Sequence, residues 1–148
     1  MVRHQRFLRR DGGTLVELAV VISIFFLFLF GILEYARLVF VRQVIVNAAR
    51  EGARYAVVNV VDSTVVSDTT AYVKTRMAGL DTKTTYYNCQ VYLSDSTGKN
   101  IGAAGDAAFG QYIAVQIDYD YTPITPNFLF LNNTIRITAR DLMYSEAN

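Results

Sequence analysis

The stretch that decides the fold runs from Thr14 to Leu33 and reads TLVELAVVISIFFLFLFGIL, an almost wholly apolar sequence. At about 1.5 Å of rise per helical residue, a helix of this length is roughly 30 Å long and matches the hydrocarbon core of a bilayer. Cleaved secretory signals have a shorter apolar region followed by small residues at a cleavage site, and no such site follows Leu33. The run therefore predicts a retained transmembrane helix.

The charges before this run predict its orientation. Four arginines precede it within the first ten residues, at Arg3, Arg6, Arg9 and Arg10. Because positive charge next to a span stays on the cytoplasmic side, we expect the N-terminus inside and the chain from Glu34 onward outside. This predicts a single-pass protein of the inner or cell membrane with an extracytoplasmic C-terminal part.

The helix is expected to continue beyond the membrane as a stalk. No proline occurs between Thr14 and about Val60, and apolar residues recur there at spacings of three and four. One face of this stalk carries small residues that allow another backbone or sheet to approach closely. These helix-packing residues are Ala48, Ala49, Gly52, Ala53 and Ala56. They are expected to pack against the chain's own C-terminal part or against a neighbouring subunit, and the sequence leaves both open.

The rest of the chain is predicted to be a small α+β domain. A short helix is expected around Thr70 to Ala78, followed by a three-stranded antiparallel sheet. The expected strands are Tyr86 to Leu93, Tyr112 to Tyr121 and Thr134 to Tyr144. The predicted organisation is a basic leader at 1–12, a long helix at 13–60 with the span at 14–33 and the stalk at 34–60, and the α+β domain at 61–148.

Two details of this domain are predicted from interruptions in its patterns. Asp141 breaks the alternation of the last strand, which indicates a bulge or a change of face that lets Leu142 and Tyr144 pack. The loop DSTGKN, from Asp95 to Asn100, lacks the spaced acids of a calcium loop and is predicted to be a turn.

Composition argues against nucleic-acid binding and catalysis. The net charge is +1 and the basic residues form no single face, so DNA or RNA binding is not expected. The only histidine, His4, lies in the leader, across the membrane from the C-terminal part. Asp118 and Asp120 are expected to pair with Arg136 and Arg140 across the sheet rather than to form a catalytic or metal site. We predict no enzyme, no cofactor and no metal site.

The only cysteine is Cys89, so the chain cannot form an intramolecular disulfide. Its position in the predicted strand from Tyr86 to Leu93 indicates a small core residue rather than a reactive thiol.

Glu17 is the one acid within the apolar run. A carboxylate at the centre of a bilayer costs about 2.5 to 3.5 kcal/mol, so acids in spans usually have a function and a partner. Glu17 lies only one turn inside the span, however, and its side chain can also reach the headgroup region at small cost. Its position alone leaves both explanations open.

The residues before Glu17 add a further pattern. Gly12 ends the basic leader, Gly13 comes next, and Glu17 lies five residues after Gly12. This resembles the processing site of type IV pilin-like proteins, which a membrane peptidase cuts after such a glycine. The resemblance implies cleavage between Gly12 and Gly13 by a prepilin-type peptidase, and pairing of the new Gly13 amine with a Glu17 carboxylate during assembly.

The following stretch narrows the resemblance. Phe30 to Val58 reads FGILEYARLVFVRQVIVNAAREGARYAVV, which resembles the TadE-like family of the tight-adherence (Tad) pilus system. The residues that carry this resemblance, together with Glu17, are Gly31, Arg37, Ala48, Ala49, Arg50, Glu51, Gly52, Ala53, Arg54, Tyr55 and Ala56. It implies a minor pilin or an assembly or priming component that supports adhesion and biofilm formation. The implied partners are the membrane, the peptidase and other pilin or Tad subunits in a homo- or hetero-oligomer.

A second hypothesis keeps the leader in place. In it, the chain is an unprocessed single-pass anchor whose C-terminal domain binds a ligand outside the membrane.

Overall fold

The computed structural model describes residues 11–60, 63–124 and 134–145. The leader arginines and His4 lie outside these residues. The described elements, in chain order, are α1 (Asp11–Val58), α2 (Val65–Arg76), β1 (Tyr87–Ser94), β2 (Asn100–Ala103), the 3-10 turn η1 (Ala104–Asp106), β3 (Tyr112–Tyr121) and β4 (Ile135–Tyr144).

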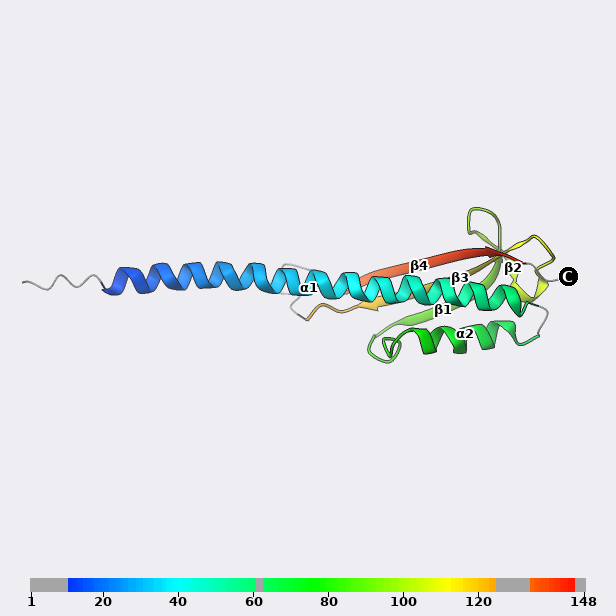
Figure 1. Cartoon of the computed structure of the whole chain (residues 1–148), viewed down its shortest axis with the longest axis horizontal. Helices are drawn as coiled ribbons and strands as arrows, with labels where there is room; N and C mark the ends of the chain where they lie inside the picture. Colours follow the sequence, from blue (N-terminus) through cyan, green and yellow to red (C-terminus); the bar gives the residue numbers. More distant parts are fainter. Residues whose placement is uncertain (1–10, 61–62, 125–133, 146–148) are drawn as a thin grey trace, which may run out of the picture.

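A single helix, α1, forms the axis of the molecule (Figure 1). Its 48 residues contain no proline, and the helix continues through Gly31 and Gly52. Its first half projects alone, and its second half lies along the globular part. The helix ends at Val58, where the backbone N–H and the side-chain amide of Asn59 both donate to the carbonyl of Tyr55, at 3.2 and 2.8 Å. These two bonds satisfy a carbonyl that the end of a helix otherwise leaves without a partner.

The strands form one antiparallel sheet in the order β2-β1-β3-β4. The predicted α+β class with a long apolar helix and a short helix is confirmed, but within the described residues the sheet has four strands, not the three predicted. The additional strand, β2, contains only four residues, and its pairing with β1 shifts register between Leu93 and Ser94. With Gly102 in its middle, β2 is too short and too poor in β-formers for its sequence pattern to predict a strand.

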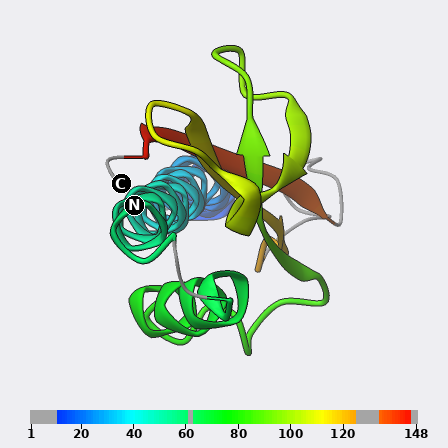
Figure 2. The ribbon, with the colours of Figure 1, turned by 90° about the vertical axis from the view of Figure 1, so that its right-hand side faces the viewer.

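Both helices pack on the same face of the sheet, as the view along the molecule shows (Figure 2). The core between these layers combines one side of α1 with the alternating inward residues of β3, as the predicted period of two requires. The largest fully buried side chains are Tyr121, Ile45, Met77, Ile113, Ile117, Val65, Val73, Val115 and Thr69. A stacked pair, Tyr55 and Tyr72, joins α1 to α2 with ring centroids 4.7 Å apart.

The predicted bulge at Asp141 is wrong. β4 pairs with β3 in continuous register to Tyr144, which places Asp141 opposite Val115 and Leu142 opposite Ala114. Asp141 therefore lies on the face toward α1, while Leu142 and Tyr144 stay on the opposite face. Tyr144 is exposed. The strand tolerates an inward acid because Asp141 is only half buried and Arg50 of α1 attracts its charge.

Asp141 gives the stability of the protein a pH dependence. Burial raises the pKa of this carboxyl, and the attraction of Arg50 opposes that rise without cancelling it. The folded chain thus binds a proton more tightly than the unfolded chain does, so this group's contribution to stability falls as pH rises from the ordinary aspartate pKa through the raised value. We expect Asp141→Asn to remove this dependence and to raise the melting temperature at neutral pH by at most about 2–4 °C. Thermal melts at several pH values test this, with the exposed Asp106→Asn as control; a lower melting temperature for Asp141→Asn at neutral pH would contradict it.

Candidate functional site: the long helix and its junction with the sheet

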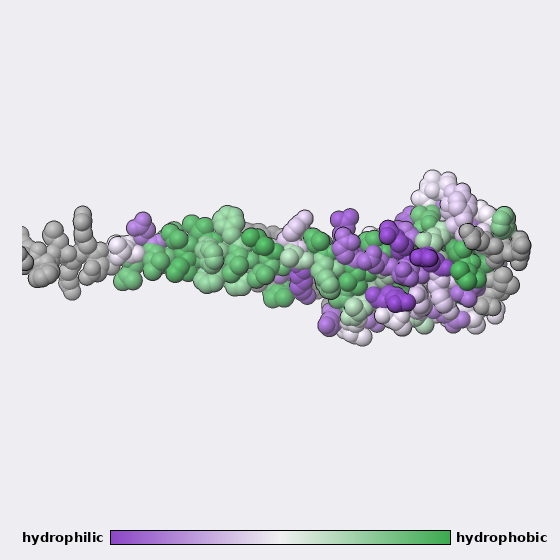
Figure 3. All heavy atoms as spheres, viewed as in Figure 1, coloured by the Kyte–Doolittle hydropathy of each residue, from purple (hydrophilic) through white to green (hydrophobic). Residues whose placement is uncertain are grey.

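The first half of α1 exposes apolar side chains over the face seen in Figure 3. Residues 13–30 are all exposed, and none of the most apolar window of the helix is buried inside the chain. Exposed fractions reach 67% for Leu15 and 66% for Phe28. A helix that is apolar all round and covered by no protein fits the interior of a bilayer. Among the described residues, α1 is the one helix that is long and apolar enough to serve as a membrane anchor.

The predicted processing residues lie at the start of this helix. α1 begins at Asp11, so the bond between Gly12 and Gly13 falls within its first turn. Two consecutive glycines weaken a helix there, because glycine loses more backbone freedom on ordering than any other residue. Glu17 is exposed and lies one helical turn beyond Gly13.

The five small residues of the stalk, which we call the small-residue seam, are buried within this chain. Ala48, Ala53 and Ala56 have no exposed surface, Ala49 is 1% exposed, and Gly52 is also buried. A Cβ atom on Gly52 would lie 2.4 Å from Cγ2 of Val73 in α2 and 3.3 Å from Cγ1 of Val115 in β3. The seam thus lets α1 approach α2 and the sheet so closely that no side chain fits at Gly52.

Sequence analysis missed a polar cluster at the end of the span. Glu34 is only 7% exposed, and it accepts hydrogen bonds from the hydroxyl of Tyr121 and from the backbone N–H of Ile124, the latter at 3.3 Å to each carboxylate oxygen. Arg37 lies 3.5 Å from the same carboxylate. Tyr121 follows Glu34 by 87 positions, so the cluster fastens the end of β3 to the base of the stalk.

Arg37 extends this cluster, which we call the Glu34 clasp. Its Nη1 donates to the Tyr121 hydroxyl and to the carbonyl of Thr122, both at 3.3 Å, and its guanidinium lies 5.0 Å from the centre of the Tyr121 ring. Burial, together with the hydrogen bond to Glu34, raises the pKa of Tyr121 to about 12, so the hydroxyl remains a proton donor at physiological pH. The sequence offered one sign of the clasp, an acid and a base three residues apart directly after the span.

The two aspartates of β3 have ordinary structural partners. Arg136 binds Asp120 through two hydrogen bonds of 2.8 and 3.1 Å, as predicted. Asp118 instead accepts from Thr138 at 2.7 Å and from Gln116, so its predicted pairing with an arginine is wrong.

The other arginine, Arg140, binds the turn between β1 and β2. Its Nη1 donates to the carbonyl of Gly98 at 2.8 Å. The positive φ of Gly98, 86°, is one that side chains rarely allow, and a Cβ there would lie 2.7 Å from the same Arg140 nitrogen. The loop predicted as a turn is thus anchored on the sheet.

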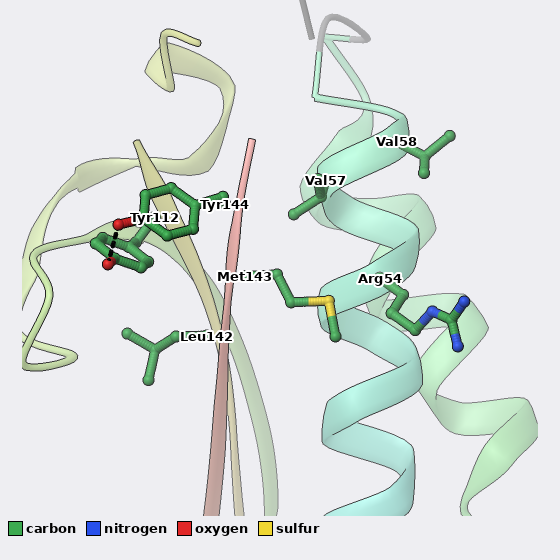
Figure 4. A pocket seen from close by; sticks show the side chains of 7 residues that line it. All are labelled: Arg54, Val57, Val58, Tyr112, Leu142, Met143 and Tyr144. Carbon is green, nitrogen blue, oxygen red and sulfur yellow. Dashed lines mark hydrogen bonds between the residues drawn. The ribbon is translucent and has the colours of Figure 1, made fainter. Parts of the chain in front are cut away.

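A groove of about 610 Å³ opens at the end of the molecule farthest from the span (Figure 4). Met143 points from β4 toward α1, and the rings of Tyr112 and Tyr144 lie together on the other side of the strand. The centroids of the two rings are 4.0 Å apart, and the hydroxyl of Tyr112 donates a hydrogen bond to that of Tyr144. The lining residues are Arg54, Val57, Val58, Tyr112, Leu142, Met143 and Tyr144.

Within residues 11–60, 63–124 and 134–145, no group of three or more histidine, cysteine or acidic residues is placed to hold a metal ion. Cys89 is a free, half-buried thiol, and burial raises its pKa. A raised pKa leaves less of the reactive thiolate at neutral pH.

The N-terminal part of the sequence matches one known family. Residues 12–54 match the model of the family described as TadE-like protein. This segment resembles the TadE-like family. The match begins at Gly12 and ends within the small-residue seam, and it covers 43 of 148 residues. No curated protein and no solved structure matches the chain.

The TadE-like segment contains the span, Glu17, the clasp residues Glu34 and Arg37, and most of the seam. The TadE-like family is a structural, pilus-associated one, and the matched segment contains a helix long and apolar enough to cross a membrane. The sheet and α2 lie outside the match, so the family describes the helix and not the part that the helix carries.

Proposed function

We propose that this chain is a pilin-type structural subunit, a minor pilin or an assembly or priming component, of a Tad-type pilus that supports adhesion and biofilm formation. The TadE-like match to α1 is the observation that carries the proposal. In this proposal the chain inserts with its N-terminus in the cytoplasm, a prepilin-type peptidase cuts between Gly12 and Gly13, and the mature helix assembles with other pilin or Tad subunits.

The arrangement of α1 supports this role. Residues 13–30 of its first half are exposed, whereas one face of its second half is buried against α2 and the sheet. Each subunit therefore presents an apolar helix for lateral contacts, while its globular part is already folded on the other end of the same helix. Cleavage after Gly12 removes the leader and creates a Gly13 amine one turn from Glu17, so processing and assembly are chemically linked.

The N-terminus of the mature protein tests the proposal. We expect the chain purified from the membranes of peptidase-competent cells to begin at Gly13, and Gly12→Leu to retain the whole leader, because a branched side chain blocks access to the scissile bond. Intact mass spectrometry and N-terminal sequencing measure both. Gly31→Leu is a matched control within the span that should be processed normally. A retained leader in the parent protein would contradict the proposal.

The groove of about 610 Å³ at the end of the molecule farthest from the span favours a second candidate function. In it, the chain is an unprocessed single-pass anchor whose globular part binds a ligand outside the membrane. This candidate requires an intact leader, so the same mass measurement separates the two.

A further inference from the structure

The junction between the span and the globular part contains a second groove, of about 310 Å³. Its lining residues are Phe30, Leu33, Glu34, Arg37 and Ile124. Phe30 and Leu33 belong to the apolar span, while Ile124 belongs to the turn after β3. The groove therefore opens at the end of the predicted span. When α1 is inserted in a bilayer, lipid is the molecule next to this groove.

Ile124 is presented outward at this depth. Its N–H is held by the Glu34 carboxylate, yet 72% of the residue is exposed. Glu34 lies one residue after the end of the predicted span, so this aliphatic side chain is fixed close to the surface of the hydrocarbon core. Covering a branched apolar residue there with lipid removes its surface from water and is favourable.

Aromatic residues surround the rest of the helix at this level. Tyr35 and Phe40 are 69% and 59% exposed. At 100° per residue they lie about 100° and 240° around α1 from Glu34, so they point away from the sheet. Aromatic side chains in this position are typical of the boundary between membrane and water.

The Glu34 clasp suits the same environment. A carboxylate at the edge of a bilayer needs donors other than water, and Tyr121, Ile124 and Arg37 supply them from within the chain. The Arg37 side chain remains 42% exposed and can meet lipid phosphate.

We propose that this end of the globular part rests in the outer surface of the bilayer that α1 crosses. The membrane seat consists of Tyr35, Arg37, Phe40 and Ile124, with Ile124 among the upper acyl carbons and Arg37 at the phosphates. The chain then contacts the bilayer twice, through its span and through the turn after β3. This inference requires that α1 is inserted, but it requires neither cleavage after Gly12 nor a pilus.

The sequence contains no tryptophan, so a single introduced tryptophan reports its own surroundings. Ile124→Trp in the full chain, reconstituted in phosphatidylcholine and phosphatidylglycerol vesicles, places the probe in the seat. Val58→Trp is the matched control, since Val58 is also a branched aliphatic residue, is 78% exposed, and lies roughly 36 Å along α1 from Glu34. Lipids brominated high on the acyl chain and aqueous iodide are the two quenchers.

We expect brominated lipid to quench the tryptophan at position 124 strongly and iodide to quench it several-fold less than the tryptophan at position 58, which should show the reverse. Equal iodide quenching at the two positions, with no quenching by brominated lipid, would overturn the proposal. Shielding from iodide that depends on the protein-to-lipid ratio, without quenching by brominated lipid, would also overturn it and assign the groove to a second copy. Where Ile124→Trp fails to fold by circular dichroism, Thr122→Trp, at an exposed position in the same segment after β3, serves as the probe under the same criteria.

Discussion

Gly52→Leu is expected to destabilise the globular part by about 1–3 kcal/mol or more, a large share of the 5–15 kcal/mol that stabilises a typical protein. Even the first carbon of the new side chain would lie 2.4 Å from Val73 and 3.3 Å from Val115, both of which are fully buried. The better helix propensity of leucine offsets less than about 1 kcal/mol of this cost. The unfolding of the full chain in detergent, followed by circular dichroism, measures the change.

Smaller variants separate the steric contact from other effects. Gly52→Ala is expected to destabilise less than Gly52→Leu, and Val73→Ala makes room for the new methyl group. The double variant Gly52→Ala/Val73→Ala should therefore lose less stability than the sum of the losses in Gly52→Ala and Val73→Ala. An unchanged or higher unfolding midpoint for Gly52→Leu would show that the seam does not pack as described here.

Glu17→Leu is expected to leave membrane insertion intact while abolishing pilus assembly. The substitution makes the span more apolar, so insertion should be at least as good. It also removes the charge that we propose pairs with the Gly13 amine, an attraction of about 4 kcal/mol for unit charges 4 Å apart at an effective dielectric constant near 20. Immunoblots of the membrane fraction and of sheared surface filaments measure the two quantities separately.

Glu17→Asp and Glu17→Gln are the matched controls for this variant. The first keeps the charge and should retain part of the assembly, whereas the second keeps the shape without the charge and should assemble as poorly as Glu17→Leu. Normal piliation in Glu17→Leu would remove the pairing from the proposal.

The elements with strong local patterns were predictable from the sequence. Strand β3 has the predicted bounds, because its apolar residues alternate without interruption and Pro123 follows. The long helix begins and ends two residues before the predicted bounds of 13 and 60, since no proline interrupts it. In both cases the pattern reflects one environment along the element, an unbroken apolar surface for the first half of α1 and a single packed face for β3.

Features that depend on distant partners were not predictable. Glu34 followed the span as an ordinary boundary residue, and only the fold brings Tyr121 and Ile124 to it. Asp141 was assigned to the wrong face because an inward acid violates the usual alternation, and its attraction to Arg50 of α1 is not evident from the strand alone. In these places tertiary contacts, not local propensity, decide the structure.

The unbroken course of α1 has a mechanical consequence. Because the span and the stalk are one helix, the head cannot turn independently of the membrane segment to which the clasp and the seam fix it. If the span shifts by one residue along a neighbouring helix, the globular part moves by about 1.5 Å along the axis. If the next residue then makes the contact that the previous one made, the globular part also rotates by about 100° about that axis. A neighbouring subunit that fixes the position of Glu17 therefore also fixes the orientation of β4 about the helix axis. This holds although Gly52, where the helix packs on the sheet, lies about 50 Å along α1 from Glu17.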